Sequence, residues 1–289
     1  MIPPVAPLAA AAAPVKAGAI HLGPLDLLAA AALVALAGAL SVALRLGLLP
    51  KLAVAALRTV VQLVLLGQVL TWVFGLDSPV VVLLLMLLMA VAAGHAAVGR
   101  SSRAFPGILT GAVATLVVTG LATTFAVTTV IIGVDPWYEP QYVVPLLGMV
   151  LGNALTGVSL CLDALLESLD LRRDVVEMEL AHGATAWEAA RAPLTDAVRR
   201  GMIPILNSMT VVGIVSLPGM MTGQILQGAD PTQAIAYQIV VMFMLAAASA
   251  LGSIGVAFVA FRRLFTAGHA LRADLIRPRG AAREARRRS

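Results

Sequence analysis

The sequence predicts an all-α polytopic membrane protein with about seven transmembrane helices, and three observations lead to this fold class. Hydrophobic residues make up 60% of the 289 positions and charged residues only 12%, and the mean hydropathy is +0.95. The apolar residues fall in runs of about 20, the length that a helix needs to cross a bilayer core about 30 Å thick. These runs do not alternate polar and apolar residues, as the strands of a membrane β-barrel would.

Seven apolar segments can be placed along the chain, each as one membrane crossing. They are 25–44, 54–74, 79–98, 108–132, 141–162, 202–226 and 234–261. The sixth is interrupted by Pro218 and several glycines, and a proline removes a backbone hydrogen bond from a helix. The predicted organisation is a disordered or weakly ordered lead-in over 1–24, a transmembrane domain over 25–265 and a basic cytoplasmic tail over 266–289.

The distribution of basic residues sets the predicted orientation. With seven crossings and the C-terminus inside, every lysine and arginine except Lys16 lies on the cytoplasmic side. Cytoplasmic loops carry the excess of positive charge in membrane proteins. We therefore expect a multi-pass protein of the plasma membrane with its N-terminus outside. Trp137 and Tyr138, in a short outer loop, suit the aromatic belt at a membrane interface.

A polar stretch at 163–201 separates the fifth and sixth apolar segments on the cytoplasmic side. It is too short for a catalytic domain and rich in helix formers, and it predicts a short helix over 177–190 with a break at Gly183. Ala184, Trp187 and Leu194 fall on one side of such a helix. An exposed amphipathic helix suits a groove in a partner protein. The alternative is a helix that lies on the lipid surface.

Several motifs resemble a known family of transporters. Glu177, Gly183-Ala184-Thr185 and Trp187 resemble the "EAA…GA[ST]xW" loop of bacterial ABC-transporter permeases, with Met178 and Glu179 in place of its two alanines. The later Leu-Pro pair of that pattern is replaced by Thr195-Asp196. LRTVVQLVLLGQVL, PLLGMVLGNALTGVSLCLDAL and the specific block SLPGMMTG resemble the Fet-type permeases, the membrane subunits of a bacterial iron-export ABC transporter, over about residues 51–270. Plant aluminium-tolerance permeases are also similar.

The resemblance implies a permease that forms a homodimer and binds two copies of a separate ATPase. Six residues would take part in coupling to that ATPase: Glu177, Glu179, Gly183, Ala184, Thr185 and Trp187. The sequence has no G-x-x-x-x-G-K-[ST] loop, whose backbone N–H groups hold nucleotide phosphates. We therefore expect ATP and Mg on the partner chain, and neither a catalytic residue nor a cofactor in this one.

Polar residues inside apolar segments are candidates for a translocation path, because they are costly in a bilayer. The proposed set combines them with the break in the sixth segment: Gln62, Asn153, Ser216, Pro218, Gly219, Met220, Met221 and Gly223. Alternatively, Pro218 is a packing kink and the methionines fill gaps. Gly148 and Gly152 form a G-x-x-x-G pattern that predicts a close helix contact. No cluster of residues has metal-ligand spacing, so no metal site is assigned.

Three functions remain open from the sequence. The first is the permease of an ATP-driven exporter of iron or another metal species. The second is an ABC permease for a polar organic solute such as a nucleotide sugar. The third is an ATP-independent secondary transporter or channel. Nucleic acid is not an expected partner, because the arginine-rich tail is interpreted as a solvated cytoplasmic end. Cys161, the single cysteine, is expected to be packed in the core.

Overall fold

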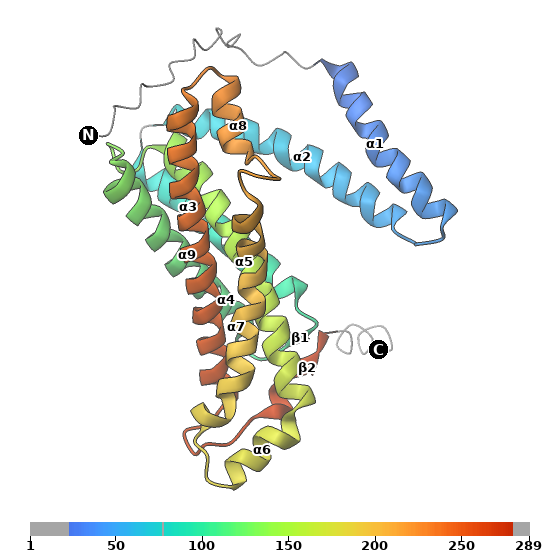
Figure 1. Cartoon of the computed structure of the whole chain (residues 1–289), viewed down its shortest axis with the longest axis vertical. Coiled ribbons are helices and arrows are strands. Elements are labelled where there is room, and N and C mark those ends of the chain that lie inside the picture. The colour runs from blue at the N-terminus through green and yellow to red at the C-terminus, as the bar shows by residue number, and fades with distance from the viewer. Residues whose placement is uncertain (1–22, 77, 280–289) are drawn as a thin grey trace, which may run out of the picture. The chain divides into compact units, whose positions relative to one another are not determined.

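The computed structural model describes residues 23–76 and 78–279, and these residues are almost entirely helical (Figure 1). Six described helical segments are long and apolar enough to cross a membrane. They are α1 (Pro24–Ala43), α2 (Leu49–Phe74), α3 (Pro79–Arg100), α4 with the π-helix η1 (Ile108–Phe125 and Ala126–Ile132), α5 (Pro140–Leu171) and α9 (Pro231–Leu264). The all-α polytopic class is confirmed. Most of the predicted lead-in, and the tail from residue 280, lie outside the described residues.

The sixth predicted segment, 202–226, is interrupted, as predicted, and is divided between two helices. Its first half is the end of α7 (Ala186–Val211), and its second half is the short helix α8 (Gly219–Leu226). Between them Gly213 has a left-handed φ of +81°, and its N–H donates to the carbonyl of Ser216 at 2.9 Å. Pro218 comes later and is the N-cap of α8, with ψ 140°. The break therefore begins at the Gly213 turn and not at the proline.

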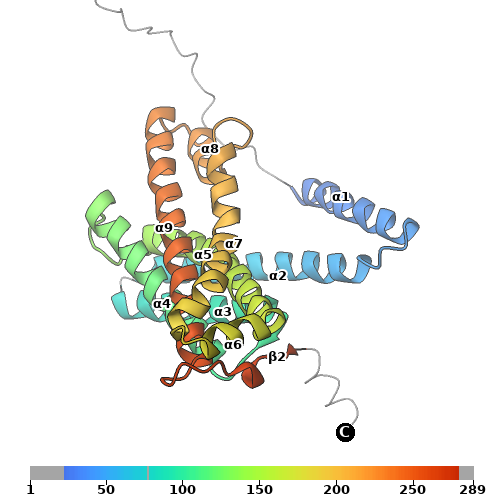
Figure 2. The same ribbon diagram turned by 60° about the horizontal axis from the view of Figure 1, so that its bottom comes forward.

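The chain divides into two compact units. Unit 1 contains Met1–Gly75 and Pro218–Gln238, and within it α1 packs against α2. Unit 2 contains Leu76–Leu217 and Ile239–Ser289. In unit 2, α5 is the most buried helix and packs against α3, α4 and α7, while α7 runs beside α9 in both views (Figures 1 and 2). The chain passes between the units at three points, and one of them, the Leu217–Pro218 bond, lies inside the 212–218 break.

The polar stretch 163–201 is mostly helical. The fifth predicted span ended at 162, but α5 continues to Leu171, and α6 (Arg173–Ala181) follows almost at once. Helix α7 begins at Ala186 and continues without interruption into the sixth predicted segment, although Pro193 and Pro204 lie inside it. The predicted break at Gly183 is therefore present between two helices, and the second of them is much longer than expected.

Three helices of unit 2 approach closely at small residues. A Cβ atom added at Gly201 of α7 would lie 2.8 Å from the backbone oxygen of Gly157 in α5 and 2.6 Å from Oγ of Ser253 in α9. Of the predicted Gly148/Gly152 pair, only Gly148 faces another helix within the chain, since a Cβ there would lie 3.5 Å from Cε of Met89 in α3, whereas a Cβ at Gly152 would have no neighbour within 4 Å. Cys161 lies beside the Gly201 contact and is fully buried, as expected. Its Sγ donates to the carbonyl of Ser253 at 3.4 Å.

The Gly201 contact gives a direct test of this packing. Gly201→Ala should lower the thermal unfolding temperature of the detergent-solubilised protein, because the new methyl group overlaps a backbone oxygen that cannot rotate away. Overpacking of this kind costs about 1–3 kcal/mol. Gly152→Ala is the matched control in α5, where the space beside the glycine is open, and it should leave the transition unchanged. Equal transitions for both variants would contradict the contact.

The number of crossings and the orientation stay predictions, and reporter fusions can test them. Fusions at Glu139 and Asp230 should report an outside location, whereas fusions at Trp187 and Arg277 should report the cytoplasm. The reason is the excess of lysine and arginine that the predicted topology places inside. A cytoplasmic signal at Glu139 would make this topology wrong.

Candidate functional site

The candidate site is the elbow between α6 and α7, which we define as residues 177–191. Helix α6 ends in a Schellman motif, in which the N–H of Gly183 donates to the carbonyl of Leu180 and the N–H of Ala184 donates to that of Glu179, both at 3.1 Å. Gly183 has a φ of +94°, a left-handed conformation that glycine adopts without a Cβ clash. The glycine thus reverses the chain between the two helices.

Helix α7 starts with a reciprocal capping box. The hydroxyl of Thr185 accepts from the N–H of Glu188 at 3.3 Å. The Glu188 carboxylate accepts from the Thr185 N–H at 2.8 Å and from its hydroxyl at 2.7 Å. These bonds lower the pKa of the Glu188 carboxyl, and the backbone bond from Thr185 contributes most. Because the folded pKa is lowered, the stability that the cap contributes is fully present above the ordinary carboxyl pKa and is lost as the pH falls below it through the lowered pKa of the folded state.

A third contact at the start of α7 comes from beyond the end of α9. The N–H of Ala186 donates to Nδ1 of His269 at 3.0 Å. His269 has a φ of +56°, which is uncommon for a residue with a side chain. It is held there by a tight turn, in which its N–H donates to the carbonyl of Thr266 at 3.1 Å. One of the N–H groups that every helix leaves free at its start is therefore satisfied by a residue 83 positions away.

His269 offers a test of how firmly the elbow is held. His269→Gly keeps the left-handed backbone but removes the acceptor nitrogen. Amide hydrogen exchange at the start of α7 should then become about fivefold faster, because a helix cap contributes about 1 kcal/mol. His269→Asn tolerates the same backbone and supplies an acceptor oxygen. Exchange in the Asn variant, measured by mass spectrometry on a peptide that contains Ala186, should stay near that of the wild type. Identical rates in both variants would contradict a capping role.

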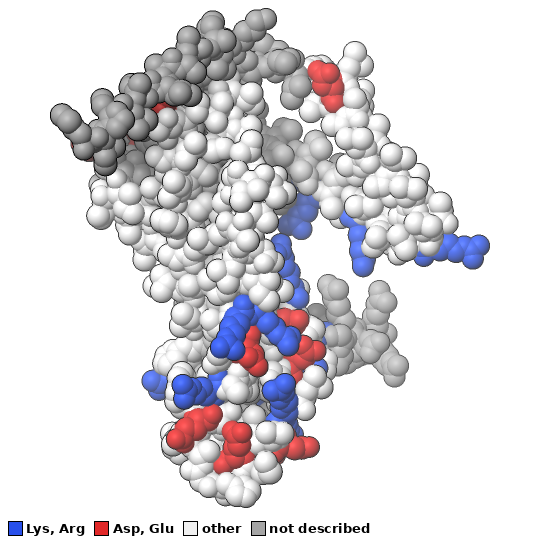
Figure 3. Space-filling model, in the orientation of Figure 1, with Lys and Arg blue, Asp and Glu red and all other residues white. Residues whose placement is uncertain are grey.

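The predicted coupling residues lie together on this elbow. Glu177 accepts from Nε of Arg173 at 2.7 Å within α6, while Glu179 is exposed and contributes its carbonyl to the Schellman motif. Trp187 is 53% exposed, and its ring meets Phe261 of α9 edge-on with centroids 5.6 Å apart. Figure 3 shows charged side chains gathered over α6 and the adjoining ends of α5 and α7. The elbow thus presents a half-exposed tryptophan in a charged region.

A polar brace next to the elbow was not predicted. Asp163 of α5 accepts from both the N–H and the hydroxyl of Ser102 at 2.7 Å, and Asp170 binds Nε of Arg103 at 2.8 Å. The strand β1 (Arg103–Ala104) also pairs with β2 (Arg277–Pro278), which follows the short 3₁₀ helix η2 (Ala273–Leu275). The α3–α4 loop is thereby tied both to α5 and to the segment after α9.

The proposed path residues are divided between the two units. In unit 1, Gln62 is exposed on α2, and Met221 of α8 is buried, with Gly219, Met220 and Gly223 lining an open hollow together with Gln224. In unit 2, Nδ2 of Asn153 donates to the carbonyl of Met149 at 3.0 Å, so part of this amide is satisfied within its own helix. Ser216 is exposed in the 212–218 break. The role of these residues in a path stays a prediction.

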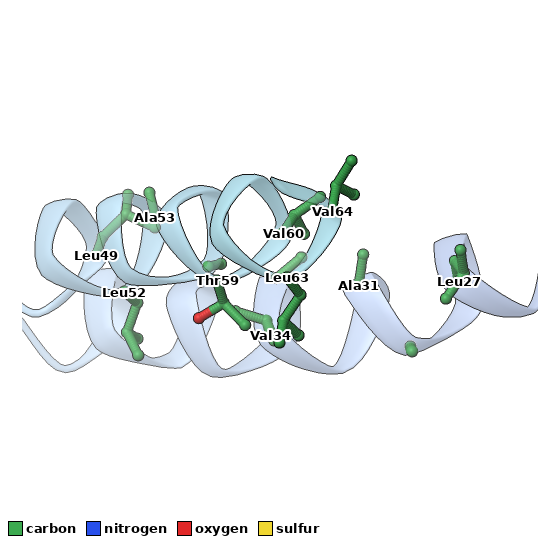
Figure 4. A pocket seen from close by; sticks show the side chains of 13 residues that line it. Leu27, Ala31, Val34, Leu49, Leu52, Ala53, Thr59, Val60, Leu63 and Val64 are labelled. Carbon is green, nitrogen blue, oxygen red and sulfur yellow. The ribbon is translucent and has the colours of Figure 1, made fainter. Parts of the chain in front are cut away.

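A further hollow of about 820 Å³ lies between α1 and α2 in unit 1 (Figure 4). Its lining is aliphatic except for Thr59, whose hydroxyl donates to the carbonyl of Ala55 at 2.9 Å. This hollow has no free polar group with which to orient a polar solute. Among residues 23–76 and 78–279, no three His, Cys, Asp or Glu side chains are grouped so that they could hold a metal ion.

Comparison with known proteins places the chain in a family. The family described as "Uncharacterised protein family (UPF0014)" matches residues 24–265. The chain belongs to the UPF0014 family. The match begins earlier than the resemblance seen in the sequence, so α1 is part of the UPF0014 region. The proline-rich N-terminus and the arginine-rich tail lie outside it, as expected.

Three relatives of the chain are informative. "UPF0014 membrane protein slr1647" of Synechocystis sp. is 38% identical over 213 residues, which cover 72% of this chain and 80% of the relative. "Probable iron export permease protein FetB" of Escherichia coli is 34% identical over 214 residues, 74% and 81% of the two chains. "Protein ALUMINUM SENSITIVE 3" of Arabidopsis thaliana is 33% identical over 243 residues, 84% and 88%. No solved structure matches the chain. The predicted relationship to the Fet-type and plant proteins is confirmed.

Proposed function

We propose that this chain is the permease subunit of an ABC transporter, and that the elbow is the surface on which a separate ATPase subunit docks. The observation that carries the proposal is the continuity of α7, which runs from Ala186 in the elbow to Val211 at the edge of the break. A helix that is capped at one end and uninterrupted can pass a movement of the elbow to the 212–218 segment.

The exposed surface of the elbow supports a docking role. Trp187 exposes about half of its surface, although tryptophan is among the residues that most often anchor protein interfaces. Schellman and capping-box bonds fix the backbone on both sides of Gly183, so little order is lost when a partner binds. We propose that two permease chains and two ATPase subunits assemble, and that ATP and Mg bind to the ATPase subunits.

For the transported substance, we propose iron or another metal species, moved outward. The name of the Escherichia coli relative supports this choice, since it describes a probable iron export permease. The name of the Arabidopsis relative points to a phenotype with a different metal, aluminium. The proposal is therefore stated for metal species as a class, with iron as the first candidate.

Two measurements test the proposal in order. First, the tagged full-length chain is purified from its native membranes, and mass spectrometry should find an ABC ATPase in near-equal amount. A chain that purifies intact without any ATPase would support the ATP-independent transporter instead. Second, a deletion strain should accumulate iron and grow poorly in excess iron, and the wild-type gene should restore growth. An ATPase partner without any metal phenotype would favour the polar organic solute.

A further inference from the structure

A second groove lies in unit 2, between α7 and α9. It has a volume of about 300 Å³, which is within the lower range for small-molecule sites. Its apolar walls are formed by Trp187, Leu194 and Val198 from α7 and by Ile254, Ala257 and Phe258 from α9. Thr195 and Arg199 complete the lining. The groove is therefore apolar along its length and carries one positive charge on its wall.

The α9 wall of this groove belongs to a membrane-spanning helix. Pro231–Leu264 has the length and hydropathy of a span, and at about 1.5 Å per residue its 34 residues extend over about 51 Å. This length exceeds the bilayer core of about 30 Å, and because Arg262 and Arg263 lie in the last turn of α9, we place this end of the helix in the headgroup region. Ile254 and Phe258 are 54% and 47% exposed there. An apolar surface at this depth is covered most favourably by lipid.

Two guanidinium groups border the groove. The guanidinium carbon of Arg262 lies 5.1 Å from the ring centroid of Phe258, and within the described residues no carboxylate lies within 4 Å of it. Arg199 has Asp196 at 3.8 Å, with 76% and 54% of the two side chains exposed, so this pair is weak. The net charge at the groove is positive, and arginine binds phosphate oxygens in a favourable planar geometry.

We propose that this groove binds one anionic phospholipid from the leaflet at which α9 ends. The phosphate contacts Arg262 and Arg199, while the upper part of an acyl chain lies along Val198 and Ile254. Basic pockets between membrane helices commonly select anionic headgroups, and each arginine near the surface contributes about 1 kcal/mol. This corresponds to about a fivefold preference per arginine for an anionic over a zwitterionic lipid.

Tryptophan fluorescence can test this inference, because Trp187 lines the groove. The chain has three tryptophans, and Trp72→Phe with Trp137→Phe leaves Trp187 as the sole emitter. The full chain is reconstituted without ATPase in phosphatidylcholine vesicles that contain a minor fraction of lipid brominated on its acyl chains. Brominated phosphatidylglycerol should quench Trp187 at a lower fraction than brominated phosphatidylcholine does, by about fivefold or more.

Charge variants then identify the headgroup contact. Arg199→Gln with Arg262→Gln should abolish the preference for phosphatidylglycerol and leave quenching by phosphatidylcholine unchanged, which also shows that the variant is folded. Arg58→Gln, an arginine on α2 in unit 1, is the matched control and should keep the preference. Equal quenching by both lipids, or an undiminished preference in the double variant, would overturn the proposal. If lipid does not quench Trp187 but added ATPase shields this residue, the groove binds a protein partner instead.

Discussion

A chain that carries Gly183→Glu should insert in the membrane and fold normally but lose its ATPase partner. The left-handed φ of +94° makes most residues with a Cβ atom, glutamate among them, costly at this position, by about 1–2 kcal/mol. A Cβ atom there would meet no neighbour within 4 Å, so the rest of the fold has space for the new side chain. The glutamate would instead project from the turn and add charge to the proposed docking surface.

Gly183→Asn separates the conformational effect from the charge. Asparagine enters the left-handed conformation more readily than other residues, so this variant should retain most of the copurified ATPase. The measurement is the ratio of ATPase to permease after affinity purification, together with ATP hydrolysis in vesicles. If Gly183→Glu copurifies the ATPase at the wild-type ratio, the elbow is not the docking surface.

Trp187→Ala should weaken the same complex by at least about thirtyfold. Truncation of a tryptophan that becomes buried at an interface commonly costs 2 kcal/mol or more. Trp72→Ala is the matched control, because Trp72 is 63% exposed and lies on α2 in the other unit. Titration of purified ATPase against vesicles that contain each variant measures the difference. Equal affinities for the two variants would exclude Trp187 as an anchor.

The sequence predicted the long apolar helices more successfully than the polar region between them. Length and hydropathy decide whether a helix can span a bilayer, and both can be read along the chain. The break at 212–218 was predicted from Pro218, but its cause is the turn at Gly213, whose conformation depends on a bond to Ser216. A hydropathy profile cannot show that a glycine among apolar residues has a left-handed backbone conformation.

Parts of the elbow could have been recognised locally, and others could not. Thr185 followed by Glu188 has the spacing of a capping box, which marks the start of a helix, and this signal was missed. His269 is different, because its contact with Ala186 depends on an uncommon backbone conformation and on the packing of α9 beside α7. The same holds for Asp163 and Ser102, which are 61 positions apart. Such contacts follow only from the tertiary structure.

Replacing both Gly213 and Pro218 with alanine should reduce transport by about tenfold or more while the protein still binds its ATPase. Each change removes one obstacle to a continuous helix between α7 and α8, since Gly213 has a left-handed φ and Pro218 lacks an N–H. Hinges often lie where elements break, and the Leu217–Pro218 bond is one of the three points at which the chain passes between the two compact units. Pro218→Ala alone leaves the Gly213 turn in place and should have a smaller effect. Transport is measured as metal efflux from vesicles.

Substitution of the two methionines beside this break distinguishes a packing role from contact with the substrate. Met221 is 8% exposed, whereas Met220 lines the open hollow of α8. Met221→Leu keeps the volume and should be mild, since volume-conserving changes in a core usually cost less than 1.5 kcal/mol. Met220→Leu should be equally mild if the residue only packs, and should lower efflux of a soft metal if its thioether binds the ion. The comparison of the two variants under one metal gradient decides between these roles.

Single cysteines placed at positions 216 to 223 test whether the segment lines a hydrated path. The native Cys161 is buried and can be replaced by alanine to give a background without thiols. Several of the new cysteines should react with a water-soluble maleimide, because a non-helical backbone at membrane depth is tolerated only beside protein or water. The set of labelled positions should change when nucleotide binds to the ATPase. Val118→Cys is the control, since Val118 lies within a predicted span and is 66% exposed, so we expect it to face lipid, where the reagent does not reach. If no position from 216 to 223 is labelled in any nucleotide state, this segment does not line the path.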